Sequence, residues 1–433
     1  MRTAPQIAAS VLWLSSMTAC FLLDDPRRRF PAYALTLLIA GVSWLILLRQ
    51  PPRWAPWLGL LPHVLALLST PAFSEDAFRY VYEGRLAWAM GPAFPFLVPP
   101  AEGPVAGVPP ELFDSSWLRI NHPELPTLYP PLSQLAFMLV ALTPLPPLLG
   151  LQLLNMGAAL GAARLLERRG LSGWVWIWLC PLVVLEGVRE AHVDGLTLLF
   201  GAWATSAWLA SKAGLGHAGF ALSALCKLAG GLGLVVGGRR DPRALAIGAG
   251  VAAAIAWPLV VLGPSAARGG LAYAGRWQGG EGVFGLLLAG AQTMLGGDWA
   301  RIGSQSFTAQ QLARGALVLL FVFVMALRLR VRPEAAQVPV WTGQLLLLAL
   351  LLSPTLHPWY VLGILPFAAA GAWPASAAGL ALTAPLLHHA SWVELMSGHW
   401  TPASWPRLVV HGVAWSALLG IWARNRGLGA GTR

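Results

Sequence analysis

Long stretches without a single charged residue constrain this chain more than any other feature. Residues 316–327 and 345–352 are two such runs. Only 11% of the chain is charged and 56% is hydrophobic, whereas roughly a quarter of the residues of a soluble protein are charged. Backbone groups in hydrocarbon must be satisfied within the chain, which leaves helices or closed barrels, and these runs lack the alternation of barrel strands. We therefore predict an all-α, polytopic integral membrane bundle.

The apolar runs also predict how the bundle is divided. Windows that approach the ~20 residues of a membrane-spanning helix give about twelve to fifteen spans, several of them half-helices. They form one predicted integral membrane domain over residues 1–424, followed by a polar tail at 425–433. A Pro-rich break at 144–147 and a short run at 174–185 interrupt the pattern. Irregular backbone at membrane depth needs protein or water-filled space around it, so these breaks predict an internal cavity.

The charged residues indicate which partners the chain has. The formal net charge is +11, but the arginines are scattered in short loops and at helix ends. This scatter is typical of residues that orient a membrane protein and contact anionic lipids, so we expect membrane lipids and no nucleic acid as partners. The three cysteines lie in apolar stretches and predict neither a disulfide framework nor a metal site.

One long polar segment, residues 73–130, follows the third predicted span. We predict a helix with Ser74 as its N-cap and with Glu75 in its first turn, where an acidic group complements the helix dipole. The spacing predicts one polar face on this helix, formed by Asp76, Arg79, Tyr80 and Glu83. A solvated interfacial helix in which Asp76 merely pairs with Arg79 is the alternative. Loops of this length are usually functional, which favours a site.

A second polar cluster, with Asn121, His122, Glu124 and Tyr129, closes the same segment. The two clusters together, Glu75-Asp76 followed by Arg79-Tyr80-Val81-Tyr82-Glu83-Gly84-Arg85 and then residues 121–131, resemble the polytopic glycosyltransferases of the GT-C superfamily. The chain is most similar to the bacterial polyprenyl-phosphate-mannose-dependent mannosyltransferases. Further motifs extend the resemblance over residues 73–365: Arg189-Glu190-Ala191-His192-Val193-Asp194-Gly195, Lys227, Tyr273-Ala274-Gly275-Arg276-Trp277 and His357-Pro358-Trp359-Tyr360.

The resemblance implies a multi-pass enzyme of the cytoplasmic (inner) membrane with the 73–130 loop on the extracytoplasmic side. Such an enzyme takes a sugar, with mannose as one candidate, from a polyprenyl-phosphate-linked donor. It transfers the sugar to a hydroxyl of a lipid or glycan acceptor in cell-envelope synthesis. By the same resemblance, Asp76 stands at the position of the catalytic base, with Glu75 beside it, and no cofactor is expected.

The chemistry of this transfer suggests roles for the remaining polar residues. An oxocarbenium-like transition state, as in glycoside hydrolysis, needs a base at the attacking hydroxyl and cations on the departing phosphate. For the phosphate we favour Arg79 or Arg85, with Arg189, Lys227 and Arg276 as further contributors. Snorkelling of Lys227 to an interface is an equally weighted alternative.

Sugar hydroxyls or the donor are the expected ligands of a further group: Glu190, His192, Asp194, His357 and Tyr360. A divalent cation is a weaker alternative for the first three, because their spacing fixes no complete ligand set. Three other histidines, His388, His389 and His399, have no spacing that requires a ligand role.

Membrane orientation is where the sequence conflicts with the resemblance. Residues 27–29 are three arginines after the first span, and the positive-inside rule places them in the cytoplasm. Counting two more spans then places the 73–130 loop in the cytoplasm too, and a similar count puts the arginines at 164–169 on the wrong side. A transporter or flippase of lipid-linked glycans is the competing function, although its halves are expected to be pseudo-symmetric and the long loop occurs once. A non-catalytic assembly subunit is a third reading.

Overall fold

Helices form most of the chain, which the computed structural model describes over residues 3–302, 305–400 and 402–430. The α-helices of the first half are α1 (Thr3–Leu22), α2 (Phe30–Arg49), α3 (Ala55–Leu58), α4 (Leu60–Leu67), α5 (Asp76–Met90), α6 (Phe94–Leu97), α7 (Pro131–Ala141), α8 (Pro147–Glu167), α9 (Asp194–Leu209) and α10 (Ala213–Cys226). Those of the second half are α11 (Gly231–Arg240), α12 (Leu245–Leu262), α13 (Arg268–Arg276), α14 (Val283–Leu295), α15 (Ala309–Leu329), α16 (Gln337–Leu352), α17 (Leu365–Ala369), α18 (Pro374–Thr383), α19 (His389–Ser397) and α20 (Ser404–Ala430).

Shorter helical turns and one hairpin complete the fold. The turns are η1 (Pro100–Glu102), η2 (Pro110–Leu112), η3 (Trp117–Arg119), η4 (Trp174–Trp178), η5 (Val183–Arg189), η6 (Leu228–Gly230), η7 (Gly263–Ala267), η8 (Pro358–Ile364) and η9 (Ala384–His388). Strands β1 (Trp299–Ile302) and β2 (Gln305–Thr308) pair antiparallel, with Trp299 opposite Thr308. The predicted helical class is thus confirmed, with this small hairpin as an unpredicted addition.

Within the part of the chain that the structure describes, four helices are long and apolar enough to cross a membrane: Ala4–Leu22, Phe30–Arg49, Pro147–Glu167 and Ala309–Leu329. A fifth span results if the bent pair Leu245–Trp257 and Leu259–Arg276, which meet at 61°, counts as one. Further apolar helices among the described residues have only 10–17 residues. The chain therefore has the character of a helical membrane protein. Helix length does not confirm the predicted number of spans.

Proline begins several of these helices. It occupies one of the first two positions of α2, α7 and α8, where its missing N–H removes no hydrogen bond. The Pro-rich break predicted at 144–147 separates α7 from α8. The short run predicted at 174–185 divides into η4 and the beginning of η5, both of which are π-helices.

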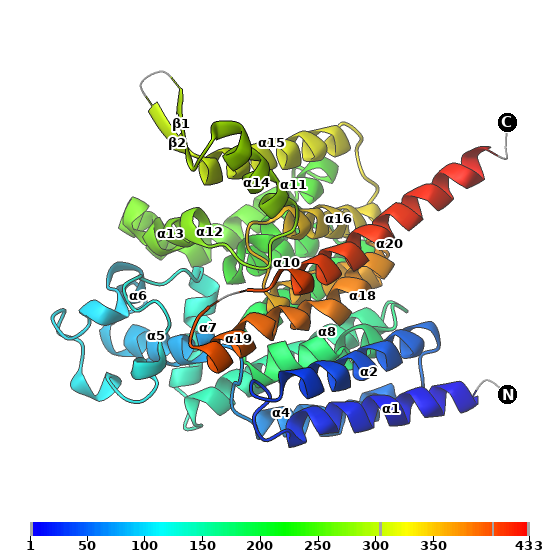
Figure 1. Ribbon diagram of the computed structural model, residues 1–433, viewed down its shortest axis with the longest axis horizontal. Coiled ribbons are helices and arrows are strands. Elements are labelled where there is room, and N and C mark those ends of the chain that lie inside the picture. The colour runs from blue at the N-terminus through cyan, green and yellow to red at the C-terminus, as the bar shows by residue number, and fades with distance from the viewer. Residues whose placement is uncertain (1–2, 303–304, 401, 431–433) are drawn as a thin grey trace.

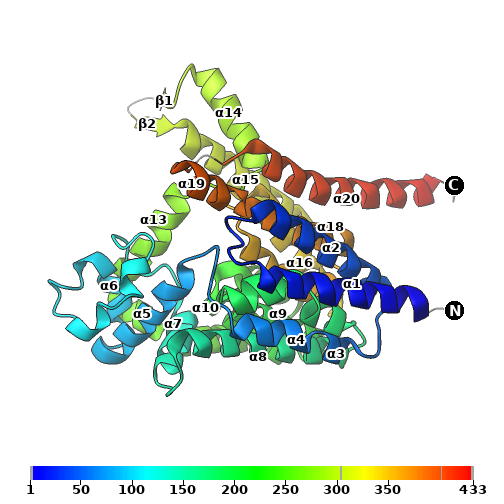
Figure 2. The same cartoon turned by 60° about the horizontal axis from the view of Figure 1, so that its bottom comes forward.

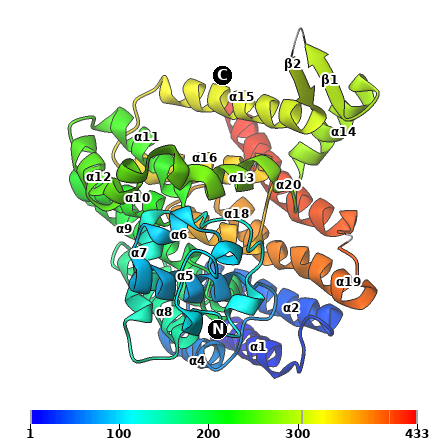
Figure 3. The ribbon, with the colours of Figure 1, turned by 90° about the vertical axis from the view of Figure 1, so that its left-hand side faces the viewer.

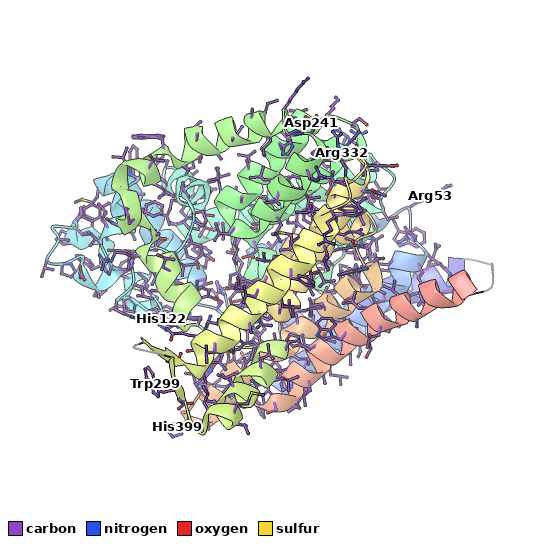
Figure 4. The ribbon with its side chains drawn as sticks, turned by 90° about the horizontal axis from the view of Figure 1, so that it is seen from above. Arg53, His122, Asp241, Trp299, Arg332 and His399 are labelled. Carbon is purple, nitrogen blue, oxygen red and sulfur yellow. The ribbon has the colours of Figure 1, made fainter. Side chains whose placement is uncertain are left out.

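The long helices run along one axis, so the molecule has two distinct ends (Figure 1). The segment 73–130, with α5 and α6, forms one end, which we call the loop end. Helix α1 begins and α20 finishes at the opposite end, and a second view agrees (Figure 2). We call that end the basic end, because the arginine-containing connections meet there. Figure 4 shows Arg53, Asp241 and Arg332 toward the basic end, and His122, Trp299 and His399 toward the loop end.

The segment 73–130 is folded against the bundle by its own small core. Helix α5 packs on α7 so closely that a Cβ on Gly84 would lie 2.3 Å from the Phe137 carbonyl oxygen. Tyr80 stacks on Phe137 with a centroid distance of 4.4 Å. The N-cap of α5 is Glu75, one residue later than predicted, and its side chain makes no capping hydrogen bond. Ser74 still contributes, because its hydroxyl accepts a hydrogen bond from the Asp76 N–H at 3.2 Å.

Candidate active site

A cavity of about 910 Å³ lies at the loop end. Seen from this end, α5 and α6 stand in front, with α13 above them and α19 to one side (Figure 3). The cavity is lined from several separate parts of the chain. Of the predicted site residues, its lining includes Glu75, Asp76, Arg79, Asn121, His122, Tyr129, Lys227, His357 and Tyr360. The structure thus brings half of the predicted residues together around one space.

Asp76 lies at the wall of this cavity and keeps limited access to it. Its side chain is 16% exposed. The amide of Asn121 donates a hydrogen bond to Oδ1 at 3.1 Å, and the His192 Nδ1 lies 3.6 Å from Oδ2. One oxygen of the Asp76 carboxylate is therefore held by a hydrogen bond, the other lies beside the His192 ring, and the side chain remains partly open to the cavity. Glu75, the other acidic candidate, is exposed and also lines the cavity.

Glu190 fixes the chain just before Asp76. Its carboxylate, which is almost completely buried, accepts hydrogen bonds from the backbone N–H groups of Ala72, Phe73 and Ser74 at 2.9–3.1 Å. A carboxylate bound by several N–H groups is strongly held. Glu190 was predicted to bind sugar, but these contacts occupy both of its oxygens and give it a positioning role. Its neighbour Arg189 reaches the Thr70 carbonyl at 3.5 Å and does not line the cavity.

Arg79 connects α5 to residues 121–125 at the other end of the 73–130 segment. Its guanidinium donates to the carbonyl oxygens of Asn121 and His122 at 2.7 Å each and of Leu125 at 3.3 Å. It also pairs with Glu83 at 3.2 Å. Because four protein groups accept its N–H donors, Arg79 holds the Asn121 region over α5. Its proposed contact with a phosphate would have to compete with these bonds.

Glu83, the ion-pair partner of Arg79, binds two further polar side chains. Its carboxylate accepts hydrogen bonds from Thr127 at 2.8 Å and from Gln134 at 2.6 Å. Burial raises the pKa of Glu83, and the charge of Arg79 and these hydrogen bonds oppose the rise. The side chain does not line the cavity, so its position gives no support to the predicted substrate contact.

Lys227 and Asp194 form an ion pair at the bottom of the site. The Lys227 Nζ lies 2.7 and 2.9 Å from the two Asp194 oxygens and 4.1 Å from the centre of the Tyr360 ring. Asp194 is almost fully buried, whereas Lys227 reaches the cavity. The Tyr360 hydroxyl contacts that of Tyr273. The cation of Lys227 is therefore partly neutralised before any ligand arrives.

An irregular backbone segment places His192 behind Asp76. Val183–Arg189 is a π-helix, and Ala191 has φ = 57°, in the left-handed region. Such π-helical turns are rare in proteins, and those that occur are often found at functional sites. The His192 ring is completely buried and stacks on Trp359 with a centroid distance of 3.9 Å. Its Nε2 lies 3.7 Å from the Glu186 carboxylate.

Besides Arg189, Glu83 and the buried Glu190, His192 and Asp194, four further predicted residues do not line the cavity. Arg85 binds Asp114 at 2.5 Å and the Glu111 carbonyl at 2.8 Å within the loop itself. Tyr80 is buried in the small core described above. Glu124 and Arg276 are exposed and do not line the cavity either. The predicted phosphate roles of Arg85 and Arg276 therefore have no support from their positions.

Other cations line the cavity instead. Arg407 also reaches it but pairs with Glu281. Among the described residues, the guanidinium groups of Arg27 and Arg119 have no carboxylate partner; Arg119 lies over the Phe78 ring at 3.7 Å. Both are free to meet an anion. Sequence reasoning missed them, because Arg27 was considered only for membrane orientation.

Glu186 and His388 were also missed. The His388 Nε2 lies 2.7 Å from the Glu186 Oε1, and His388 lines the cavity. Glu186 follows an apolar run directly, and an acidic residue in such a setting is a functional signal that the sequence did contain. The two residues are 202 positions apart, so their contact had no local signal. The described residues contain no cluster of three or more His, Cys, Asp or Glu that could hold a metal ion.

Comparison with protein-family models, with curated proteins and with solved structures yields no match to this chain.

Proposed function

We propose that the chain is an integral membrane glycosyltransferase. It transfers a sugar from a polyprenyl-phosphate-linked donor to a hydroxyl acceptor, with Asp76 as the base. The observation that carries this proposal is the oriented, partly exposed carboxylate of Asp76 at the wall of a large cavity. A base of this kind must lie within reach of the proton that it removes, and the cavity offers the room for donor and acceptor together.

The distribution of cations supports a position of the active loop outside the cytoplasm. The connections at the basic end contact one another: Trp178 donates to the Pro56 carbonyl, Arg169 to Ser206 and Arg332 to the Arg240 carbonyl. They contain Arg49, Arg53, Arg164, Arg168, Arg169, Lys212, Arg239, Arg240, Arg243, Arg330 and Arg332, and only three of the chain's 18 acidic residues, Glu167, Asp241 and Glu334. Such cations suit a cytoplasmic leaflet rich in anionic lipids.

The loop end differs in that six of its cations form ion pairs with acidic residues. Every Lys or Arg ion pair among the described residues lies there, including Arg28 with Asp25 in the first connection. Arg27 from that connection lines the cavity with Asp76. The three arginines at 27–29 and the 73–130 loop therefore share one side, as the span count required. The arginines at 164–169 lie at the opposite, basic end.

This orientation can be tested with single introduced cysteines. The native residues Cys20, Cys180 and Cys226 are all buried, so background labelling is expected to be low. In right-side-out membrane vesicles, Ser115→Cys in the loop is expected to react with a membrane-impermeant maleimide. Ala336→Cys, close to Arg332 at the basic end, is expected to react only after the vesicles are opened. The reverse pattern would place the loop in the cytoplasm and contradict the proposed topology.

An assay in detergent separates the enzyme from a flippase. Purified protein is mixed with polyprenyl-phosphate sugars, mannose among them, and with lipid or glycan acceptors bearing free hydroxyls. Detergent leaves no second compartment, so sugar attached to an acceptor reports transfer and not transport. Failure of every donor and acceptor pair, in protein that remains folded, would count against the enzyme and favour the flippase.

Arg27 provides a test of the donor phosphate. A charge-assisted hydrogen bond to phosphate contributes about 1.5–3 kcal/mol, so Arg27→Gln is expected to raise the donor KM by roughly 10- to 100-fold and to change kcat less. Arg28→Gln is the matched control, because Arg28 is exposed and paired with Asp25. Steady-state kinetics with varied donor measure the effect. Equal KM values for the two variants would exclude Arg27 from the phosphate site.

A further inference from the structure

A row of four polar side chains leads from the cavity into the protein and back. It consists of Asp76, His192, Glu186 and His388, with successive separations of 3.6, 3.7 and 2.7 Å. Asp76 and His388 line the cavity, whereas Glu186 and His192 are almost completely buried. His192 and Glu186, the middle pair of the row, therefore lie behind Asp76, where a substrate in the cavity cannot touch them.

The hydrogen-bonding needs of Glu186 determine how His192 is protonated. Within the described part of the chain, the Glu186 Oε2 is buried and has no hydrogen-bond partner. A buried carboxylate oxygen without a donor is costly, and the Nε2 of His192 is the donor that faces it. Asp76 is less dependent on His192, because it is partly exposed and already accepts from Asn121. The proton of neutral His192 therefore belongs on Nε2, which leaves Nδ1 open toward Asp76.

Burial of His192 favours this neutral state before the reaction. The ring lies in the connection between η5 and α9. Burial, together with the positive charge of Lys227, lowers the pKa of His192 well below its usual range. The ring faces Asp76 on one edge and Glu186 on the other, and it stacks on Trp359. At neutral pH its Nδ1 is consequently an unprotonated acceptor that lies directly behind the base.

We propose that His192 is the final proton acceptor of the sugar transfer, with Glu186 fixing its tautomer and His388 fixing Glu186. This inference rests on the proposed function. The acceptor oxygen bonds to the anomeric carbon as the bond from that carbon to the phosphate oxygen breaks, and the electron pair leaves with the polyprenyl phosphate. The hydroxyl proton passes to Asp76 and from Asp76 to the His192 Nδ1. The resulting imidazolium lies between two carboxylates, and after the product leaves it releases the proton through Asp76 to water in the cavity.

This arrangement follows the logic by which a buried carboxylate orients a histidine and stabilises its charged form. The separations of 3.6 and 3.7 Å are longer than hydrogen bonds, but catalytic contacts commonly shorten when substrate binds. A carboxylate alone, with its low reference pKa, is a modest base. Passing the proton to the His192 ring places the positive charge between the carboxylates of Asp76 and Glu186, which stabilise it, while the ring stays out of the cavity. Glu186 and His192 are thus positioning and proton-holding residues that touch no substrate.

Nitrogen NMR of the histidines tests the tautomer without any substrate. Full-length protein is labelled with ¹⁵N-histidine in detergent, and the His192 signal is identified by its loss in His192→Phe. The Phe ring preserves the stack on Trp359 and removes both nitrogens. We expect a neutral ring at pH 7 with its proton on Nε2, and a loss of this preference in Glu186→Gln. A proton on Nδ1, or on both nitrogens, at pH 7 would overturn the proposal, because His192 would have no vacant site facing Asp76.

Kinetics test the role in transfer. His192→Phe and Glu186→Gln are each expected to lower kcat by about 100-fold, within the range of a general base, while the donor KM changes less than about twofold. Glu186→Asp is expected to recover part of the loss. The exposed His399→Gln serves as the control with parent kcat. If both variants keep the parent kcat, the proposal is wrong. If the parent protein itself transfers no sugar, the proposed function fails. The NMR result then still decides whether His192 carries its proton on Nε2.

Discussion

Asp76→Asn is expected to abolish sugar transfer, with a loss of at least about 100-fold in kcat, because general bases contribute about 10²–10⁴-fold. The amide retains the shape of the carboxylate and an oxygen that can accept from Asn121, but it cannot take a proton. Membrane insertion and expression are therefore expected to stay at the parent level. The measurement is the rate of sugar transfer by purified protein in detergent.

Two further variants make the Asp76 result specific. Glu102→Gln removes an exposed carboxylate of the same loop that does not line the cavity, and it is expected to act like the parent. Glu75→Gln examines the other member of the acidic pair. Transfer at the parent rate by Asp76→Asn would refute the assignment of the base. Loss of transfer in Glu75→Gln alone would move the base to Glu75.

Lys227→Met is expected to give the largest loss of stability. Asp194 has a side chain only 3% exposed, and Lys227 is its ion-pair partner at 2.7 Å. Removing one member of a buried pair leaves an uncompensated charge and costs about 3–5 kcal/mol. The thermal unfolding midpoint in detergent is expected to fall accordingly. Binding of a donor is expected to weaken too, because Lys227 lines the cavity.

A double variant separates the pair from other effects of the substitution. Lys227→Met combined with Asp194→Asn removes both charges, so most of the lost stability is expected to return. The control is Lys212→Met, which changes the only other lysine of the chain at an exposed position. If the double variant is as unstable as Lys227→Met, packing rather than the unpaired carboxylate of Asp194 causes the loss.

Local patterns predicted much of this structure. The long apolar runs predicted helices, and the acidic pair predicted the start of α5 to within one residue. The helical spacing also placed Arg79 and Glu83 one turn apart, where they form an ion pair. These features depend on residues that are close in sequence. The hairpin β1 and β2 has only four residues in each strand, too few for a distinct pattern.

Contacts between distant residues could not be predicted in the same way. Arg79 looked available for phosphate, yet its partners are backbone carbonyls more than 40 positions away. Glu190 looked like a sugar ligand, but it meets backbone N–H groups 116–118 residues earlier. A side chain's chemistry is visible in a sequence, whereas the groups that occupy it depend on the tertiary fold. For this reason the sequence pattern predicted which polar residues gather near the cavity more reliably than it predicted what each of them contacts.

The clamps made by Arg79 and Glu190 have a mechanical consequence. Arg79 fastens residues 121–125 to α5, and Glu190 fastens residues 72–74 to the end of η5. The cavity wall that carries Asp76 is thus held by hydrogen bonds at residues 72–74 and at residues 121–125. The facing wall includes Tyr273 and Trp277, at the end of α13, and Glu394 and Leu395 of α19. Widening of the cavity to admit a bulky lipid-linked sugar is therefore expected to come from movement of α19, while the base stays still.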